Sequence, residues 1–260
     1  MTLSRVVVGE GPATVVVLTG GHTFVSRFDE ARATREARRL QRLFPDGTRL
    51  CIVAFTPTDS QDVAVPRLAA DTAVLLRTDY PGAILAGVSF GGLVALRVAA
   101  DHADAVSRLV LIASAHRFSD EGRQRVARQI DALRAGDLDA MMRPFLSLCR
   151  RWWLNALLAA RVRLRRQHLR AQFNDPRLVV AMLEAALAES GALPPRLADI
   201  QSPALIIGGG ADQFFGDGAM QALAGALPRA TLRLVPHETH MLPLERPDLV
   251  AAHMHDFLHP

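Results

Sequence analysis

Short apolar runs alternate with longer amphipathic stretches in the first part of the chain. The runs of strand length are residues 5–9, 14–18, 49–55, 83–88 and 108–114. The stretches with helical spacing of apolar residues are 26–44, 66–78 and 90–102. Strands that alternate with helices in this way are typical of a mostly parallel sheet covered by helices. The sequence therefore predicts the α/β fold class.

The alternation stops between residues 117 and 198 and then resumes. Within that segment only helical patterns occur, notably over 122–133 and 152–172. Strand patterns return at 203–210 and 230–236, and helical patterns at 219–227 and 246–258. We therefore predict a core made of residues 1–116 and 199–260, with a helical insertion over 117–198.

Composition and charge narrow the class of protein. Of the 260 residues, 50% are hydrophobic and 22% charged, which is ordinary for a globular protein. No apolar run approaches the roughly 20 residues that span a bilayer, and no basic start precedes an apolar leader. We therefore expect a cytoplasmic protein without stable membrane insertion.

The chain contains no lysine, which excludes Schiff-base and P-loop lysine chemistry. The net charge of +4 is not by itself a sign of nucleic-acid binding, since a high isoelectric point is expected when every cation is arginine, and we expect no nucleic-acid partner.

Cysteine, histidine and glycine patterns give no sign of a cofactor. Cys51 falls in a predicted strand and Cys149 in a predicted helix, and we interpret both as packing residues. His237 and His240 have a spacing seen in zinc sites but lack an acidic or cysteine partner at ligand spacing. The glycine turns lack the third glycine of a dinucleotide fingerprint. We predict neither a metal nor an organic cofactor.

Ser89 occupies the centre of a Gly-Val-Ser-Phe-Gly segment, residues 87–91, where an apolar strand is followed directly by a helix. A serine on so sharp a turn projects its hydroxyl above the sheet and needs small residues two positions away on each side. The backbone N–H of Phe90, at the start of the helix, favours negative charge beside that hydroxyl. We predict that Ser89 is a nucleophile.

A serine nucleophile needs a base, and the base needs an orienting carboxylate. Asp212 follows a predicted strand and a glycine turn, at the edge of the sheet where α/β sites lie. His237 and His240 follow the last predicted strand, and His240, the later of the two, is the preferred base. The chain order Ser89, Asp212, His240 is that of the hydrolase triad on an α/β sheet.

These motifs resemble the α/β-hydrolase family over nearly the whole chain. His240 is followed by Glu245 and Pro247 at the family's usual offset, although Thr239 replaces the usual glycine. The resemblance implies an α/β-hydrolase fold in which residues 117–198 form a helical cap. It also implies a serine hydrolase that cleaves a carboxylic ester, thioester or lactone through an acyl-enzyme on Ser89. The expected partner is a small acyl substrate, free or carrier-bound, whereas the oligomeric state is not predicted.

The sequence departs from the family at the loop after residues 14–18. Relatives usually have His-Gly there, whereas this chain has Thr19 and Gly20. The resemblance makes Gly21 the matching oxyanion-hole donor beside Phe90, and it leaves His22 either facing the pocket or supporting the loop. The missing histidine motivates an alternative function for the same pocket, as a nonhydrolytic lyase, cyclase or ligand receptor.

Aromatic residues and one arginine cluster remain to be placed. The candidates to line an acyl pocket, each of which could instead belong to the core, are Phe118, Phe145, Trp152, Trp153, Phe214 and Phe215.

The arginine cluster covers residues 150–170. We interpret it as a cap helix that roofs the pocket with its apolar face and exposes its arginines. The other interpretation is a basic amphipathic helix that binds an anionic membrane or an acidic partner such as a carrier domain.

Overall fold

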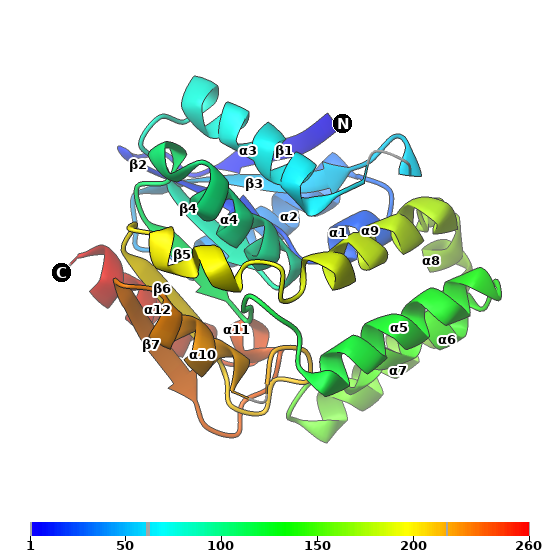
Figure 1. The fold of residues 1–260 in the computed structure, drawn as a ribbon. Coiled ribbons are helices and arrows are strands. Elements are labelled where there is room, and N and C mark those ends of the chain that lie inside the picture. Colours follow the sequence, from blue (N-terminus) through cyan, green and yellow to red (C-terminus); the bar gives the residue numbers. More distant parts are fainter. Residues whose placement is uncertain (1, 61–62, 217, 260) are drawn as a thin grey trace.

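A twisted sheet forms the centre of the protein (Figure 1). The computed structural model describes residues 2–60, 63–216 and 218–259. The strands are β1 (Thr2–Val8), β2 (Ala13–Leu18), β3 (Thr48–Thr56), β4 (Ile84–Val88), β5 (Leu109–Ile112), β6 (Ala204–Gly209) and β7 (Ala230–Val235). Their order in the sheet is β1-β3-β2-β4-β5-β6-β7, with β1 antiparallel to β3 and every other pairing parallel. The predicted α/β class is confirmed.

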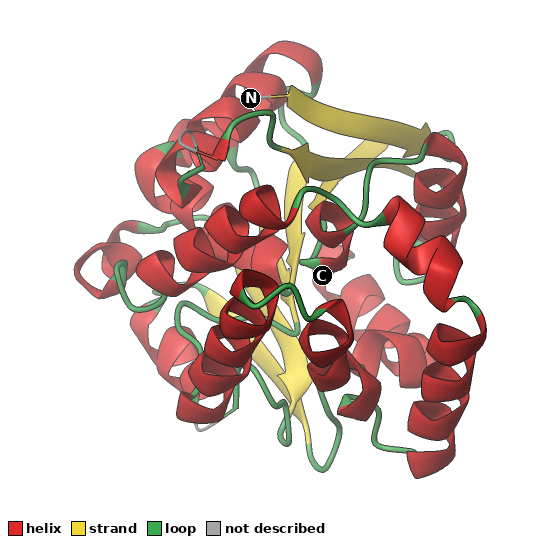
Figure 2. Ribbon diagram, turned by 90° about the vertical axis from the view of Figure 1, so that its right-hand side faces the viewer, coloured by secondary structure: helices red, strands yellow, loops and turns green. Residues whose placement is uncertain are grey.

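Both faces of the sheet are buried, which explains the unbroken apolar runs of its strands. In β2, Val16 and Leu18 belong to one apolar cluster, whereas Val15 and Val17 belong to the other. The helices that supply the first cluster include α3 (Val65–Asp79), α4 (Phe90–Asp101) and α10 (Ala219–Ala226). Those that supply the second are α2 (Glu30–Gln41) and α12 (Pro247–Leu258). Figure 2 shows the resulting layers, with helices on both sides of the strands.

Only helices occur between β5 and β6 in the structure. They are α5 (Asp120–Arg134), α6 (Leu138–Met142), η3 (Arg143–Ser147), α7 (Trp152–Leu164), α8 (Arg166–Gln172), α9 (Pro176–Glu189) and η4 (Pro194–Asp199). Most of them lie together beyond one end of the sheet, at the right in Figure 1. The helix predicted over 152–172 is in fact two, because Arg165 leaves the helical conformation, with φ −103° and ψ 15°.

Two further local predictions are corrected by the structure. The stretch 26–44 becomes helical only at Glu30, because the side chain of Asp29 accepts a hydrogen bond from the Arg32 N–H and so caps the helix there. Cys149 lies in a loop rather than in a helix, held by two hydrogen bonds between its backbone and the Asn155 side chain, each 2.9 Å long. Its thiol and that of Cys51 in β3 are buried, and burial raises the pKa of both.

Two short helices complete the part of the fold that positions the site. They are α1 (His22–Val25), which follows β2, and α11 (Leu242–Glu245), which precedes α12. Among the described residues, no helix is both long and apolar enough to cross a membrane.

Candidate active site

The turn at Ser89 is as strained as the motif predicts. Ser89 has φ 53° and ψ −119°, a conformation that side-chain-bearing residues rarely adopt. A Cβ atom added to Gly87 would lie 2.5 Å from the Cα of Gly92, and one added to Gly91 would lie 2.1 Å from the Leu18 carbonyl oxygen. The glycines are therefore required by the close packing of the strand, the turn and the new helix.

Two hydrogen bonds hold this turn in place. The Ser89 N–H donates to the Ile112 carbonyl at 3.0 Å, and the Ser114 hydroxyl donates to the Ser89 carbonyl at 2.8 Å. Ser114 also fills the space beside Gly92, where an added Cβ would come within 2.2 Å of its Oγ atom. Sequence analysis missed Ser114 because nothing in the chain near Ser89 points to a residue in the loop after the neighbouring strand β5.

The structure brings Ser89, His240 and Asp212 together. The Nε2 atom of His240 is 3.0 Å from the Ser89 Oγ atom. On the other side of the ring, Nδ1 is 2.9 Å from Asp212 Oδ2 and 3.1 Å from Oδ1. These three residues come from the loops after β4, β6 and β7, which meet at the carboxyl edge of the parallel sheet. His237, the alternative base, is exposed in the loop before His240.

The carboxylate of Asp212 is completely buried and held by backbone donors. Its side chain is 0% exposed, and Oδ1 accepts hydrogen bonds from the N–H groups of Phe214 at 2.8 Å and Phe215 at 2.9 Å. A carboxylate fixed in this way directs the proton of the imidazole to Nδ1, which leaves Nε2 free to accept a proton from Ser89. The arrangement can therefore increase the nucleophilicity of the serine.

The expected oxyanion donors occupy the starts of two helices next to Ser89. Phe90 is the first residue of α4, and Gly21 precedes α1. The loop before α1 packs directly on Ser89, because a Cβ added to Gly20 would lie 3.3 Å from the Ser89 Cβ atom. Backbone N–H groups at helix starts are suited to bind developing negative charge.

Thr19 maintains this loop without the histidine that relatives usually have there. Its hydroxyl donates to the Val53 carbonyl at 2.9 Å and lies 2.9 Å from the Thr23 hydroxyl. Thr23 in turn donates through its hydroxyl to the Gly20 carbonyl at 3.0 Å. The two threonines therefore link the loop to β3 and to the start of α1.

His22 supports the same loop from outside. Its Nε2 atom pairs with Glu36 on α2, and its side chain is 56% exposed. Of the two roles left open by the sequence, this contact supports the one in which His22 holds the loop, and a role in the substrate pocket stays a prediction.

The aromatic candidates separate into two groups. Phe214 packs edge-on against the His240 ring, with ring centroids 4.9 Å apart, and Phe215 lies 6.0 Å from it. Phe118 stacks on Phe215 at 4.9 Å. These three buried rings form an apolar wall beside the base.

The other three aromatic candidates are not found beside the base. Phe145 lies in η3, half-buried against the core. Trp152 and Trp153 are 78% and 47% exposed, so the expectation that they line a pocket or join the core is wrong. Both residues lie at the start of α7, a helix in which no residue is buried.

Three further polar residues hold the histidine loop, and the sequence gives no sign of two of them. Gln213 accepts a hydrogen bond from the His240 N–H at 3.2 Å, and its amide donates to two carbonyls at the end of η3. Buried Glu238 accepts from Arg150 Nε at 3.3 Å and from Arg246. Glu245 accepts from the backbone N–H of Arg150 at 2.8 Å. Only Glu245 is visible in the sequence pattern, because it belongs to the segment after His240 that resembles the family.

Comparison with known proteins agrees with this geometry. Residues 11–253 match the model of the alpha/beta hydrolase family, and the chain belongs to that family. It is 32% identical over 208 residues to the pimeloyl-[acyl-carrier protein] methyl ester esterase of Chromobacterium violaceum. The aligned region covers 74% of this chain and 78% of that protein.

Solved structures share the fold at lower identity. An α/β hydrolase enzyme from a Medee basin deep-sea metagenome library matches with a TM-score of 0.78 and 16% identity over 99% of this chain and 94% of that one. The enol-lactonase from Burkholderia xenovorans matches with a TM-score of 0.72 and 22% identity over 99% and 96% of the two chains. At such identities these likenesses show the fold alone.

Proposed function

We propose that this protein is a serine hydrolase that cleaves a carboxylic ester, thioester or lactone through an acyl-enzyme on Ser89. The observation that carries the proposal is the 3.0 Å distance between Ser89 Oγ and His240 Nε2, with the buried Asp212 carboxylate on the far side of the ring. A serine, a base within hydrogen-bond reach and an orienting acid are the requirements of nucleophilic catalysis by an alcohol.

In the first half of the reaction, His240 takes the hydroxyl proton as Ser89 Oγ attacks the substrate carbonyl carbon. The N–H groups of Gly21 and Phe90 stabilise the resulting oxyanion, an effect worth roughly 2.7–4 kcal/mol per donor. The C–O or C–S bond to the leaving group then breaks, and His240 returns its proton to that group. Asp212 stabilises the imidazolium that exists between these two steps.

In the second half, water replaces the leaving group. His240 removes a proton from the water as its oxygen attacks the acyl carbon of the Ser89 ester. The second tetrahedral intermediate uses the same two backbone donors. Its collapse releases the carboxylic acid and returns the proton to Ser89 Oγ, so the enzyme is regenerated without a cofactor.

Residues 117–198 are proposed to act as the cap of this active site. The start of α5 is joined to the loop of Asp212, because Ser119 N–H donates to the Phe214 carbonyl at 2.8 Å. The Gln213 and Glu245 side chains join the segment around residues 147–151 to the loop of His240. The proposed cap is thus attached directly to the loops of Asp212 and His240, where it can select the acyl group.

The substrate class follows from the site and from the curated relative. That relative is named for a methyl ester of an acyl group carried by a carrier protein. We therefore propose a small acyl ester, free or carrier-bound, as the substrate, with the rings of Phe118, Phe214 and Phe215 forming its apolar surroundings.

A panel of p-nitrophenyl esters, acyl thioesters and lactones tests the proposal. The wild-type protein is expected to hydrolyse at least one of them, and Ser89→Ala to abolish that turnover. Ser107→Ala is the matched control, since Ser107 precedes β5 at the opposite edge of the sheet. A folded wild-type protein that turns over no member of the panel would favour the nonhydrolytic alternative, a lyase, cyclase or ligand receptor.

A further inference from the structure

Helix α7 presents an apolar face that nothing in the described structure covers. Its exposed apolar residues recur at helical spacing and form what we call the outer stripe, Trp153, Ala156, Leu157, Ala160 and Leu164. Leu164 is 87% exposed and Leu157 59%. Large apolar side chains gathered on one exposed face mark an interaction site rather than an ordinary surface.

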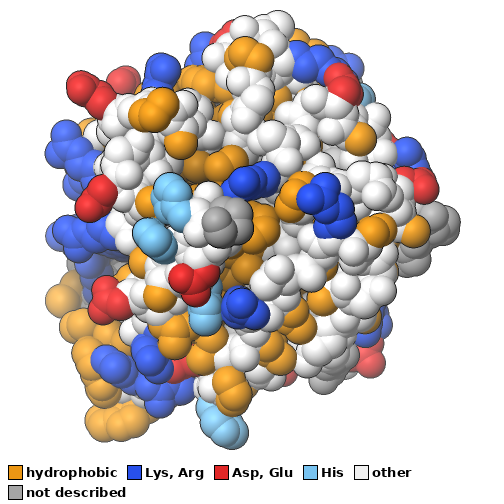
Figure 3. All heavy atoms as spheres, turned by 90° about the vertical axis from the view of Figure 1, so that its left-hand side faces the viewer, with side chains coloured by type: hydrophobic (Ala, Val, Ile, Leu, Met, Phe, Trp, Pro, Cys, Tyr) orange, Lys and Arg blue, Asp and Glu red, His pale blue; other side chains and the backbone are white. Residues whose placement is uncertain are grey.

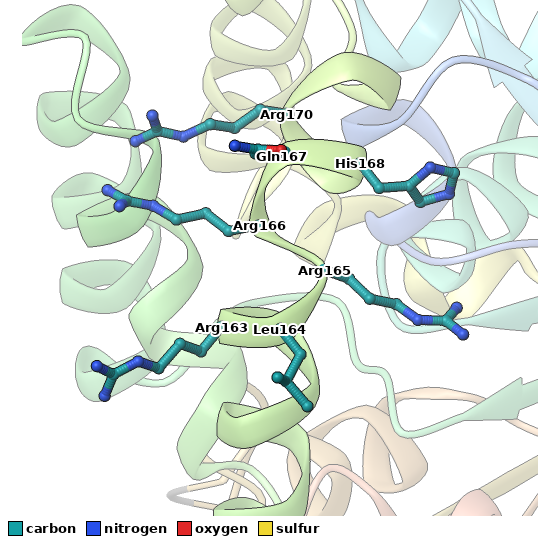
Figure 4. A pocket seen from close by; sticks show the side chains of 7 residues that line it. All are labelled: Arg163, Leu164, Arg165, Arg166, Gln167, His168 and Arg170. Atoms are coloured by element: carbon teal, nitrogen blue, oxygen red, sulfur yellow. The ribbon is translucent and has the colours of Figure 1, made fainter.

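Arginines border the outer stripe. With 100° between successive residues of a helix, Arg161 and Arg163 fall on its two sides. On both sides of the bend at Arg165, Figure 4 shows arginines, with Arg163, Arg166 and Arg170 extended to one side of the chain and Arg165 and His168 to the other. Together with Leu164 and Gln167 these side chains line a hollow of about 780 Å³, whose lining includes no residue of the triad.

The positive charge of this segment is only partly neutralised. Asp139 on α6 pairs with both Arg166 and Arg170. Within the described ranges, no acidic side chain forms an ion pair with Arg161, Arg163 or Arg165. The opposite side of the molecule differs, because acidic, basic and histidine side chains are interspersed there (Figure 3).

We propose that α7 and α8 dock the protein on the surface of an anionic phospholipid membrane. The outer stripe would enter the headgroup region, and the arginines beside it would bind lipid phosphates. With 13 residues, α7 is about 20 Å long, too short to cross a bilayer, so it lies flat on the surface.

The side chains themselves favour a membrane over a folded protein partner. Tryptophan is enriched at membrane interfaces, where its ring meets both apolar and polar surroundings, and Trp152 and Trp153 are adjacent here. Trp152 and Leu164 protrude almost fully into solvent. A bilayer interface accepts such protruding side chains without a complementary surface, whereas a folded partner needs one.

The segment is attached at both ends to the loops of the active site. At its start, Glu245 binds the backbone N–H groups of Arg150 at 2.8 Å and Arg151 at 3.2 Å. At its end, the Gln172 carbonyl accepts from Arg27 N–H at 2.9 Å, two residues after α1. A membrane that binds α7 and α8 would therefore hold the histidine loop and the oxyanion loop close to lipid-borne substrates.

Intrinsic fluorescence tests the proposal directly, because the two tryptophans of the chain are both in α7. The protein is titrated with phosphatidylcholine vesicles that contain or lack phosphatidylglycerol. We expect a blue shift of the emission and co-sedimentation only with the anionic vesicles, both weakened by added salt. A wild-type protein that ignores anionic vesicles overturns the proposal.

Two triple variants with the same net charge distinguish binding by this particular surface from a general effect of net charge. Since each arginine near an anionic surface contributes roughly 1 kcal/mol, Arg161→Gln, Arg163→Gln and Arg165→Gln together are expected to weaken vesicle binding roughly 100-fold. The control replaces three exposed arginines of α2, Arg35, Arg38 and Arg39, and is expected to bind like the wild type. Equal loss in both triple variants would overturn the proposal.

The same assay distinguishes a membrane from two other partners that could bind the outer stripe. A blue shift that depends on protein concentration without vesicles would assign the outer stripe to a second copy of the chain. A salt-sensitive complex with an acidic carrier protein, in the absence of vesicle binding, would assign it to that protein. Either result overturns membrane docking, and unchanged thermal unfolding of each variant ensures that the comparison concerns folded protein.

Discussion

The Nε2 atom of His240 lies 3.0 Å from the Oγ atom of Ser89, although 151 positions separate the two residues in the sequence. The parallel sheet accounts for this proximity. Ser89 follows β4 and His240 lies in the loop after β7, and the carboxyl ends of parallel strands point to the same edge. The fold thus supplies the geometry that the proposed chemistry requires.

Asp212→Asn is expected to reduce kcat by roughly 10⁴-fold while leaving the fold intact. The amide oxygen can still accept from the Phe214 and Phe215 N–H groups, but an amide N–H directed at the ring favours the wrong tautomer of His240. Steady-state hydrolysis of a p-nitrophenyl ester and the melting temperature give the two readouts. A variant with near wild-type kcat would show that Asp212 does not orient the base.

Gly21→Pro tests the oxyanion donor. Proline fits the φ of −59° at this position but removes the N–H group, so we expect kcat to fall about 10²–10³-fold with little change in KM. Gly21→Ala is the matched control, since its Cβ makes the same 3.3 Å approach to Phe24 and retains the N–H. If the two variants lose activity equally, the loss is steric and the assignment of Gly21 as a donor is wrong.

Gly91→Ala is expected to destabilise the protein by about 3 kcal/mol or more, because the new Cβ would lie 2.1 Å from the Leu18 carbonyl oxygen and the backbone must move. The comparison is Gly225→Ala in α10, where an added Cβ meets nothing within 4 Å. That change is expected to stabilise the helix by roughly 0.5–1 kcal/mol. Urea unfolding of both variants measures the contrast, and equal stabilities would contradict the packing described at the turn.

His116 is expected to make the protein less stable in mild acid. Burial lowers the pKa of its imidazole below its usual value of 6.5, and its Nδ1 atom has no hydrogen-bond partner among the described residues. As the pH falls below about 6.5, the unfolded chain takes up a proton that the folded state does not, so the free energy of unfolding decreases. Above that pH both states are neutral, and His116 makes no contribution to the pH dependence.

The measurement for His116 is the free energy of unfolding in urea at about pH 7 and pH 5. His116→Gln should show a smaller loss between the two than the wild type, whereas the exposed His255→Gln should match the wild type. An identical loss in all three proteins would remove His116 as a source of the acid sensitivity.

The sequence predicts the fold class and the residues of the candidate site because both leave local signals. Apolar periodicity marks each strand, and the serine with its flanking glycines marks the sharp strand-to-helix turn within five consecutive residues. The interactions that hold the histidine loop leave no such signal. Glu238, for example, meets Arg150 only after the segment between β5 and β6 has folded against the core.

The outer stripe shows a second limit of pattern analysis. Periodicity indicates that α7 has apolar faces but not which of them is covered. It therefore does not show that Trp152 and Trp153 are exposed rather than part of a pocket or the core. The sequence does not reveal the bend at Arg165 either, because α7 and α8 have the same basic and apolar composition on both sides of it. The boundaries of the cap at residues 117 and 198 remain a prediction.

The central claim is that Ser89 is an activated nucleophile, and labelling with a fluorophosphonate probe followed by mass spectrometry of the digested protein tests it most directly. The account predicts one covalent adduct, located on Ser89, which is absent from Ser89→Ala and much slower to form in His240→Ala. Folded wild-type protein that takes no label on Ser89 at any pH would contradict it.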